Sequence, residues 1–163
     1  MTIEDINSLS REQFIEAVGW VFEHSPWVAK RAWERRPFSD LEHLHAAMTQ
    51  EIERATPEEQ LALLRAHPDL GARAKMSAAS ADEQSGTGLD NLTPEEYQRL
   101  QQRNTAYREK FGFPFLYAVK GSTKYDILQA LDRRLGAAPA EEFREALAQV
   151  YRIAASRLRD TIS

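Results

Sequence analysis

Helix-start signals recur along this chain, and they constrain its fold more than any other feature. A Ser or Thr followed three residues later by Glu or Gln is typical of a capping box, in which two side chains satisfy backbone N–H groups at a helix start. This pattern begins at Ser10, Ser39, Thr56, Ser80 and Thr93. Three prolines that directly follow Ser or Thr suit the first helical position. Helices are therefore expected over most of the chain.

Stop signals at Pro37, Gly112 and Gly136 complete the helix boundaries. The predicted helices span residues 11–23, 26–35, 40–55, 57–66, 94–111, 122–135 and 140–160, with shorter pieces at 3–7 and 77–86. Residues 113–119 resemble a strand, but they have no partner run and Pro114 would interrupt a ladder, so we expect an extended connection. The predicted fold is all-α: an irregular bundle of about eight to nine helices without a sheet, in a single domain over residues 1–163.

Composition argues against several classes of protein. The 163 residues include no cysteine, which excludes disulfides, thiol nucleophiles and thiolate metal sites. The net charge of −4 argues against a nucleic-acid partner, which needs an excess of Lys and Arg. The short basic pairs at 35–36 and 133–134 are interpreted as solvated helix faces. No apolar run approaches the ~20 residues that span a bilayer, and the N-terminus is unlike a signal peptide. We therefore expect a cytoplasmic protein with no membrane partner.

Two polar residues interrupt apolar stripes. Arg157 lies within the stripe of the last predicted helix, and a guanidinium on an inward face needs a partner. It could form a structural ion pair, reach solvent along its stem, or anchor an anionic substrate through bidentate hydrogen bonds. Asn104 interrupts the stripe of helix 94–111 in the same way. We interpret it as a tether for a neighbouring loop rather than as a substrate contact.

His67 stands out among the histidines. It ends a predicted helix, and Pro68 pushes it out of the helical region towards an extended conformation. A histidine near neutrality can act as a general acid, although a residue here can also simply cap the last carbonyls. His43 and His45 point to opposite sides of one predicted helix, and no His-Glu-x-x-His pattern occurs, so no metal site is predicted.

Segment 80–88 surrounds two long polar side chains, Glu83 and Gln84, with small residues. Gly86 and Gly88 would let a ligand approach the backbone closely. The simpler interpretation is that Glu83 only completes a capping box with Ser80. A phosphate loop is not predicted, because no Gly-Lys-Ser/Thr follows.

Taken in order, these segments resemble the 2-oxo-4-hydroxy-4-carboxy-5-ureidoimidazoline (OHCU) decarboxylase family. The motifs are His-Pro-Asp-Leu-Gly at 67–71, Glu-Gln at 83–84 with Gly-x-Gly-Leu at 86–89, and Asn-x-x-Tyr-x-x-Lys-Phe-Gly-Phe-Pro-Phe at 104–115. The similarity continues through Lys120, Arg-Leu-Gly at 134–136 and Arg-Leu-Arg at 157–159. Each motif is common by itself, but the ordered set is specific and covers most of the chain.

The resemblance implies an all-helical carboxy-lyase of purine metabolism that needs neither metal nor organic cofactor. It would convert OHCU, its small-molecule partner, to (S)-allantoin and carbon dioxide in urate degradation, as a monomer or homodimer. His67 would be the catalytic acid/base, with stereoselective protonation, and Glu83 would act beside it. The implied substrate-binding residues are Pro68, Ser80, Gln84, Phe115, Leu116, Tyr117, Ala118, Val119 and Arg157.

Two departures and two rival functions accompany this interpretation. The chain reads Gly71-Ala72-Arg73 where many members of the family continue with Ala-Gly. Tyr117 stands where a branched aliphatic residue is more usual in the family, so an inward-pointing phenol would make that wall smaller or more polar. The first rival is a non-catalytic helical interaction module, whose partner surface would be formed by exposed Trp20, Trp27 and Trp33. The second is a hydrolase of a related ureido compound that uses Glu83 and His67 on water.

Overall fold

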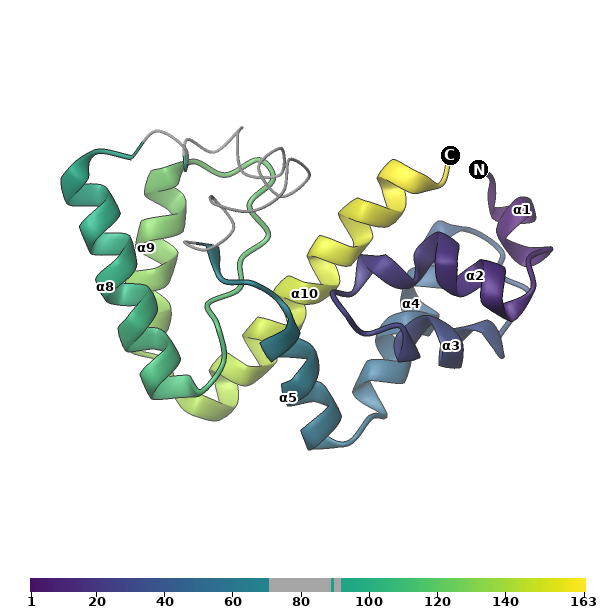
Figure 1. Cartoon of the computed structure of the whole chain (residues 1–163), viewed down its shortest axis with the longest axis horizontal. Coiled ribbons are helices and arrows are strands. Elements are labelled where there is room, and N and C mark those ends of the chain that lie inside the picture. The colour runs from purple at the N-terminus through teal and green to yellow at the C-terminus, as the bar shows by residue number, and fades with distance from the viewer. Residues whose placement is uncertain (71–88, 90–91) are drawn as a thin grey trace. The chain divides into compact units, whose positions relative to one another are not determined.

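The computed structural model describes residues 1–70, 89 and 92–163, and every regular element in these ranges is helical (Figure 1). The elements are α1 (Ile3–Asn7), α2 (Arg11–Val18), the 3-10 turn η1 (Gly19–Val21), α3 (Trp27–Trp33), α4 (Leu41–Glu53), α5 (Pro57–Ala66), α8 (Pro94–Phe111), α9 (Lys124–Leu135) and α10 (Pro139–Thr161). The predicted all-α class is confirmed. The predicted piece at 77–86 lies outside the described residues.

Side-chain caps explain where several helices begin. Ser10 and Thr93 form the predicted capping boxes at α2 and α8. At α5, Thr56 and Glu59 exchange the same two hydrogen bonds, each of 3.1 Å. Two further boxes, which begin at Thr2 and Thr123, have Asp at the third helical position. The Ser/Thr-x-x-Glu/Gln pattern does not include these two sites, but the shorter Asp carboxylate also reaches the cap N–H.

Two local predictions are wrong. The cap of α4 is Asp40 rather than Ser39: its carboxylate accepts the His43 N–H at 2.8 Å, and Asp caps a helix as well as Ser does. The predicted helix 11–23 is interrupted, because Val18 has φ −129° and ψ −3° and the 3-10 turn follows. A Cβ on Gly19 would lie 3.2 Å from the Ile15 side chain, a tight contact that would require Ile15 to shift.

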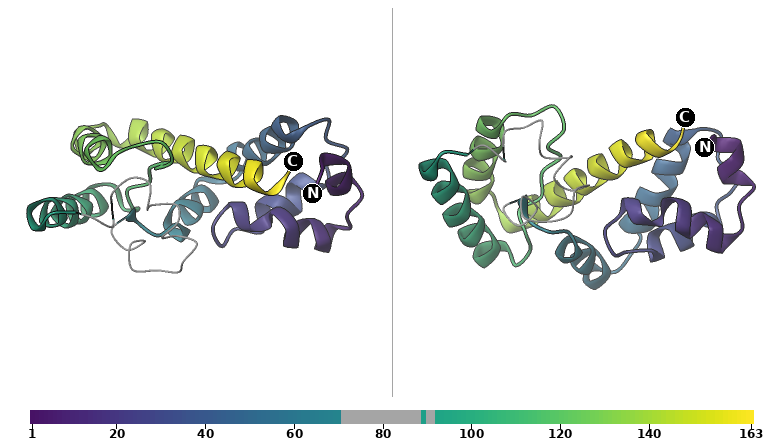
Figure 2. Two further views of the ribbon diagram at one scale, coloured as in Figure 1. Left: turned by 90° about the horizontal axis from the view of Figure 1, so that it is seen from above. Right: turned by 45° about the horizontal axis from the view of Figure 1, so that its top comes forward.

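The chain forms two compact units, and α10 contributes residues to both. The first unit comprises Met1–Ala66 and Val150–Ser163. Its termini lie side by side, where the Ser163 N–H donates to the Met1 C=O at 2.8 Å (Figure 2). Its core consists of side chains with no exposed surface, among them Ile6, Phe14, Phe22, Leu44, Met48, Ile52 and Leu158. The second unit comprises His67–Gln149. That the two units behave as a single domain stays a prediction.

In the second unit α8 packs beside α9 (Figure 1), and an ion-pair cluster joins their exposed sides. Asp132 of α9 accepts from both Arg99 and Arg103 of α8. Burial by itself would raise the pKa of Asp132, but hydrogen bonds from Arg99 and then Arg103 outweigh it and hold the pKa below its usual range. The cluster therefore stabilises the fold only while Asp132 is ionised.

Asp132→Asn is expected to flatten the acid side of the stability profile. A carboxyl with a depressed folded-state pKa stabilises the protein above its unfolded pKa of about 4, and the contribution is lost as pH falls through the folded value. The variant should therefore be less stable than wild type at pH 7 and should approach it below about pH 4. Urea unfolding from pH 7 to pH 2 measures this. A stability difference that does not change with pH would contradict it.

Candidate functional site

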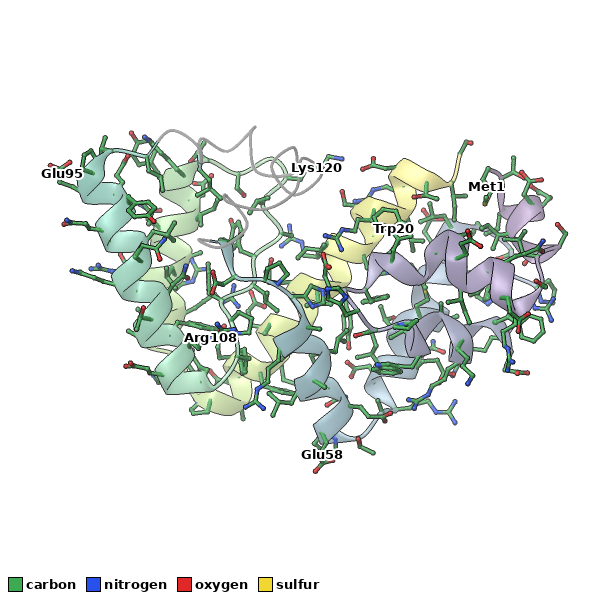
Figure 3. All side chains as sticks on the ribbon, viewed as in Figure 1. Met1, Trp20, Glu58, Glu95, Arg108 and Lys120 are labelled. Atoms are coloured by element: carbon green, nitrogen blue, oxygen red, sulfur yellow. The ribbon has the colours of Figure 1, made fainter. Side chains whose placement is uncertain are left out.

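His67 is a buried histidine directly after the last residue of α5. It is 1% exposed, and it leaves the helix at the predicted position. Leu64 before it and Leu70 after it are also buried, so the His-Pro turn lies in an apolar surrounding. Asp69 in the same turn faces Arg108 of α8 at 3.7 Å, which ties the turn to α8 within the second unit; Figure 3 labels Arg108. An imidazole held in this way has a defined position and little contact with bulk water.

The segment after α8 has no regular helix or strand, as predicted, and is nevertheless largely buried. Phe113, Phe115 and Leu116 are at most 3% exposed. Tyr107 contacts Phe113 and Phe115 edge to face, with ring centroids 5.9 and 5.3 Å apart. A buried stretch without a ladder must satisfy its backbone groups through side chains.

Arg134 of α9 supplies one of those side chains. Its Nη1 donates to the Leu116 C=O at 2.7 Å, while Nε donates to Glu142 at 2.8 Å and Nη2 lies 2.6 Å from the same carboxylate. The side chains of Arg134 and Glu142 are only 5% and 1% exposed. Tyr107 also donates to Glu142, and burial followed by this hydrogen bond raises the pKa of the phenol, which stays protonated.

The interpretation of Arg134 as part of a solvated basic face is therefore wrong. Arg134 lies one turn after Leu131 and two turns after Ile127, on the same buried stripe of α9. This is the signal that singled out Arg157, and it identifies Arg134 equally well.

Gln149 of α10 supplies the second anchor for the segment. Its Oε1 accepts the Ala118 N–H at 2.8 Å, and its side chain is 5% exposed. The Tyr117 hydroxyl lies 3.0 Å from Ser122 Oγ, and its ring stacks on Phe115 with centroids 6.2 Å apart. Tyr117, the residue that departs from the family pattern, is thus half-buried, and its hydroxyl contacts a residue close to it in sequence.

Arg157 lies in the first unit, on α10. It is 7% exposed; its Nη2 donates to Glu23 at 2.9 Å and its Nη1 to the Val21 C=O at 3.4 Å. The guanidinium carbon lies 5.8 Å from the ring centre of Trp20, which is 49% exposed and is labelled in Figure 3. The ion-pair interpretation of Arg157 therefore has a partner in Glu23.

The predicted site residues are distributed over both units. His67, Pro68 and residues 115–119 belong to the second unit, and Arg157 belongs to the first. Ser80, Glu83 and Gln84 lie outside the described residues, so their roles stay predictions. Within residues 1–70, 89 and 92–163, no group of three or more His, Asp or Glu side chains is placed to hold a metal ion. Over the same ranges, no helix is long and apolar enough to cross a membrane.

Asn104 is buried as predicted, at 8% exposure. Its amide nitrogen and oxygen, however, find no hydrogen-bond partner in the described part of the chain. The predicted tether to a neighbouring loop is therefore not made by any described residue.

Comparison with known proteins places these features in a family context. A sequence model of the OHCU decarboxylase family matches residues 7–159. A Halalkalicoccus jeotgali protein named 2-oxo-4-hydroxy-4-carboxy-5-ureidoimidazoline decarboxylase is 47% identical, over 98% of this chain and 91% of its own length. A uric acid degradation bifunctional protein of Bacillus subtilis is 44% identical, over 99% of this chain and 33% of its own length.

Two solved structures share the fold. The crystal structure of an (S)-allantoin synthase matches with a TM-score of 0.84 and 32% identity, and the match covers 99% of this chain and 54% of that one. A crystal structure of OHCU decarboxylase in the presence of (S)-allantoin matches with a TM-score of 0.70 and 24% identity, over 93% of this chain and 97% of that one. This chain thus corresponds to about half the length of the first structure and to nearly all of the second.

Proposed function

This chain belongs to the OHCU decarboxylase family and is therefore a carboxy-lyase, and we propose that it converts OHCU to (S)-allantoin and carbon dioxide in urate degradation. The observation that carries the proposal is the buried His67 at the end of α5, inside the family's His-Pro motif. The motif shares its unit with the buried segment 113–119.

The reaction sets three tasks for the protein. Loss of carbon dioxide leaves an electron pair on the ring carbon, and the adjacent C=N system of OHCU can accept it. The enzyme must hold the departing carboxylate out of the ring plane, stabilise the charge that spreads into the ring, and protonate one face. Donors preorganised towards developing charge contribute several kcal/mol to such a step.

His67 is proposed to handle the proton, hydrogen-bonded to the substrate hydroxyl or the reacting carbon. A positioned acid or base contributes about 10²–10⁴-fold in rate. Because His67 is 1% exposed, water has little access to the same position, and protonation would come from one direction. Glu83 is proposed to act beside His67, with Pro68, Ser80 and Gln84 as a wall of the site; this part rests on the family resemblance.

Segment 115–119 and Arg157 are proposed to bind and orient the substrate. The backbone of the segment would meet the ureido and ring amides, and Arg157 would meet the anionic end. Arg suits a carboxylate because its planar fork donates two parallel hydrogen bonds. Glu23, which now accepts from Arg157 at 2.9 Å, is half-buried and would have to share the guanidinium with the substrate.

Arg157→Ala is expected to raise KM for OHCU by about 10–100-fold, which corresponds to the ~1.5–3 kcal/mol of a hydrogen bond to a charged group. Arg152→Ala is the matched control, because Arg152 lies on the same helix and is exposed. Initial rates over a range of OHCU concentrations give both constants. If Arg157→Ala keeps the wild-type KM and only lowers the melting temperature, Arg157 serves the Glu23 pair alone.

The proposed reaction is tested by generating OHCU in situ from urate and following circular dichroism. Rapid growth of an (S)-allantoin signal with the protein is expected. A rate equal to the spontaneous decay, with racemic product, would overturn the proposal. Release of carbon dioxide without ammonia or urea would distinguish the decarboxylase from a hydrolase of a related ureido compound.

The interaction-module alternative loses part of its support. Trp27 and Trp33 are half-buried, and guanidinium groups of Arg31 and Arg36 stack on them at 4.5 and 3.8 Å from the ring centres. The predicted patch of three exposed indoles is therefore not present, and Trp20 is the exposed member of the set.

A further inference from the structure

We propose that Arg134 and Gln149 are positioning residues that orient the two peptide groups flanking Tyr117, so that the backbone N–H and C=O of Tyr117 face the substrate. The inference rests on the proposed function and deepens it. The proposed function already assigns the ureido or ring amide to the backbone of segment 115–119, and the inference adds the two side chains that hold that backbone in place.

The first peptide group joins Leu116 to Tyr117. Its carbonyl accepts from Arg134 Nη1 at 2.7 Å, a hydrogen bond strengthened by the donor's charge. The peptide is planar and trans, so its N–H points in the direction opposite to its C=O. The Tyr117 N–H is therefore directed away from Arg134.

The second peptide group joins Tyr117 to Ala118. Its N–H donates to Gln149 Oε1 at 2.8 Å. By the same planarity, the Tyr117 C=O is directed away from Gln149. The two anchors come from different helices, α9 and α10, and both side chains are at most 5% exposed.

The Tyr117 backbone groups are left open by this arrangement. Among the described residues, the hydrogen bonds of the segment use the Leu116 C=O, the Ala118 N–H and the Val119 C=O, and none uses the N–H or C=O of Tyr117. Backbone donors and acceptors that make no hydrogen bond within the protein are available to a ligand or to water. A ureido group or cyclic amide carries an N–H donor beside a C=O acceptor, which complements one donor and one acceptor from a single residue.

Glu142 stabilises the buried guanidinium of Arg134 beside the Leu116 carbonyl. Arg134 can bring a positive donor to a buried carbonyl because Glu142 neutralises it through Nε and Nη2, which leaves Nη1 for Leu116. Only a fork with several donors serves both partners in fixed directions, whereas a lysine offers a single ammonium. The geometry of the fork thus sets the direction of the peptide group.

The test compares Gln149→Met with Gln60→Met. Gln60 is a matched control: it is 8% exposed, and its side chain makes a 2.8 Å hydrogen bond to a backbone group, the Ile52 C=O in the first unit, as Gln149 does with Ala118; Gln149 Nε2 additionally donates to Glu145 at 3.3 Å. Both variants should lose similar stability. Gln149→Met alone should raise KM for OHCU about tenfold with kcat changed less than about threefold, as expected for lost uniform binding.

The outcomes are separable. If the wild-type protein does not accelerate OHCU decay, this result contradicts the proposed function itself rather than the positioning role of Gln149. If the wild type is active and the KM of Gln149→Met equals that of Gln60→Met, the positioning role is overturned. Should Gln149→Met not fold, Arg134→Lys provides the second test, because it keeps the charge opposite Glu142 and loses the fork. An unchanged KM in that variant would likewise overturn the inference.

Discussion

Replacing His67 with asparagine is expected to lower kcat for OHCU decarboxylation by about 10²–10⁴-fold, the contribution of a positioned acid or base. Asparagine retains a polar side chain in the buried position but cannot transfer a proton near neutral pH. The residual product should be racemic, because protons from solution reach both faces of the ring. Circular dichroism follows the enantiomeric excess, and total allantoin gives the rate.

His45→Asn is the matched control for this variant. His45 is half-buried on α4, and its Nε2 lies 2.8 Å from the Tyr151 C=O, so the change also removes a hydrogen bond from a packed histidine. We expect a modest loss of stability and wild-type kinetics. If the His67 variant keeps the wild-type kcat and still produces (S)-allantoin, His67 does not transfer the proton. The assignment of the protein as a decarboxylase would not be affected.

Glu142→Ala is expected to lower the free energy of unfolding by about 3–5 kcal/mol, because it leaves Arg134 as a buried charge without its carboxylate. The side chains of this pair are 5% and 1% exposed, so water cannot replace the lost partner. Tyr107 loses the acceptor of its hydroxyl as well. Urea unfolding at pH 7, with m-values compared between the two proteins, measures the change.

An exposed pair provides the control. Arg11 and Glu12 lie 3.4 Å apart with side chains 44% and 76% exposed, and Glu12→Ala should cost less than about 1 kcal/mol. Adding Arg134→Met to Glu142→Ala should recover part of the loss, because it removes the unpaired guanidinium. A loss in Glu142→Ala no larger than in Glu12→Ala would contradict the argument.

The sequence by itself determined the class of the fold and many helix ends. Capping is an interaction between residues three apart, so its pattern is visible in one dimension, as at Ser10 and Thr93. The predicted ranges 3–7, 57–66 and 94–111 coincide with α1, α5 and α8. The error at Ser39 arose where two adjacent residues could each cap the helix, and the error in 11–23 arose where Val18 leaves the helical conformation before a 3-10 turn.

The sequence also identified polar residues on apolar stripes, and both Arg157 and Asn104 proved to be buried. It could not name their partners. Arg157 pairs with Glu23 across 134 residues of sequence, and Ala118 donates to Gln149 across 31. Helical periodicity predicts that a charged side chain points toward the core. Only the packing of the helices determines which carboxylate or peptide group binds that side chain. The tertiary structure alone therefore decided that Arg134 binds Glu142 and the Leu116 carbonyl, and that no hydrogen bond among the described residues uses the backbone of Tyr117.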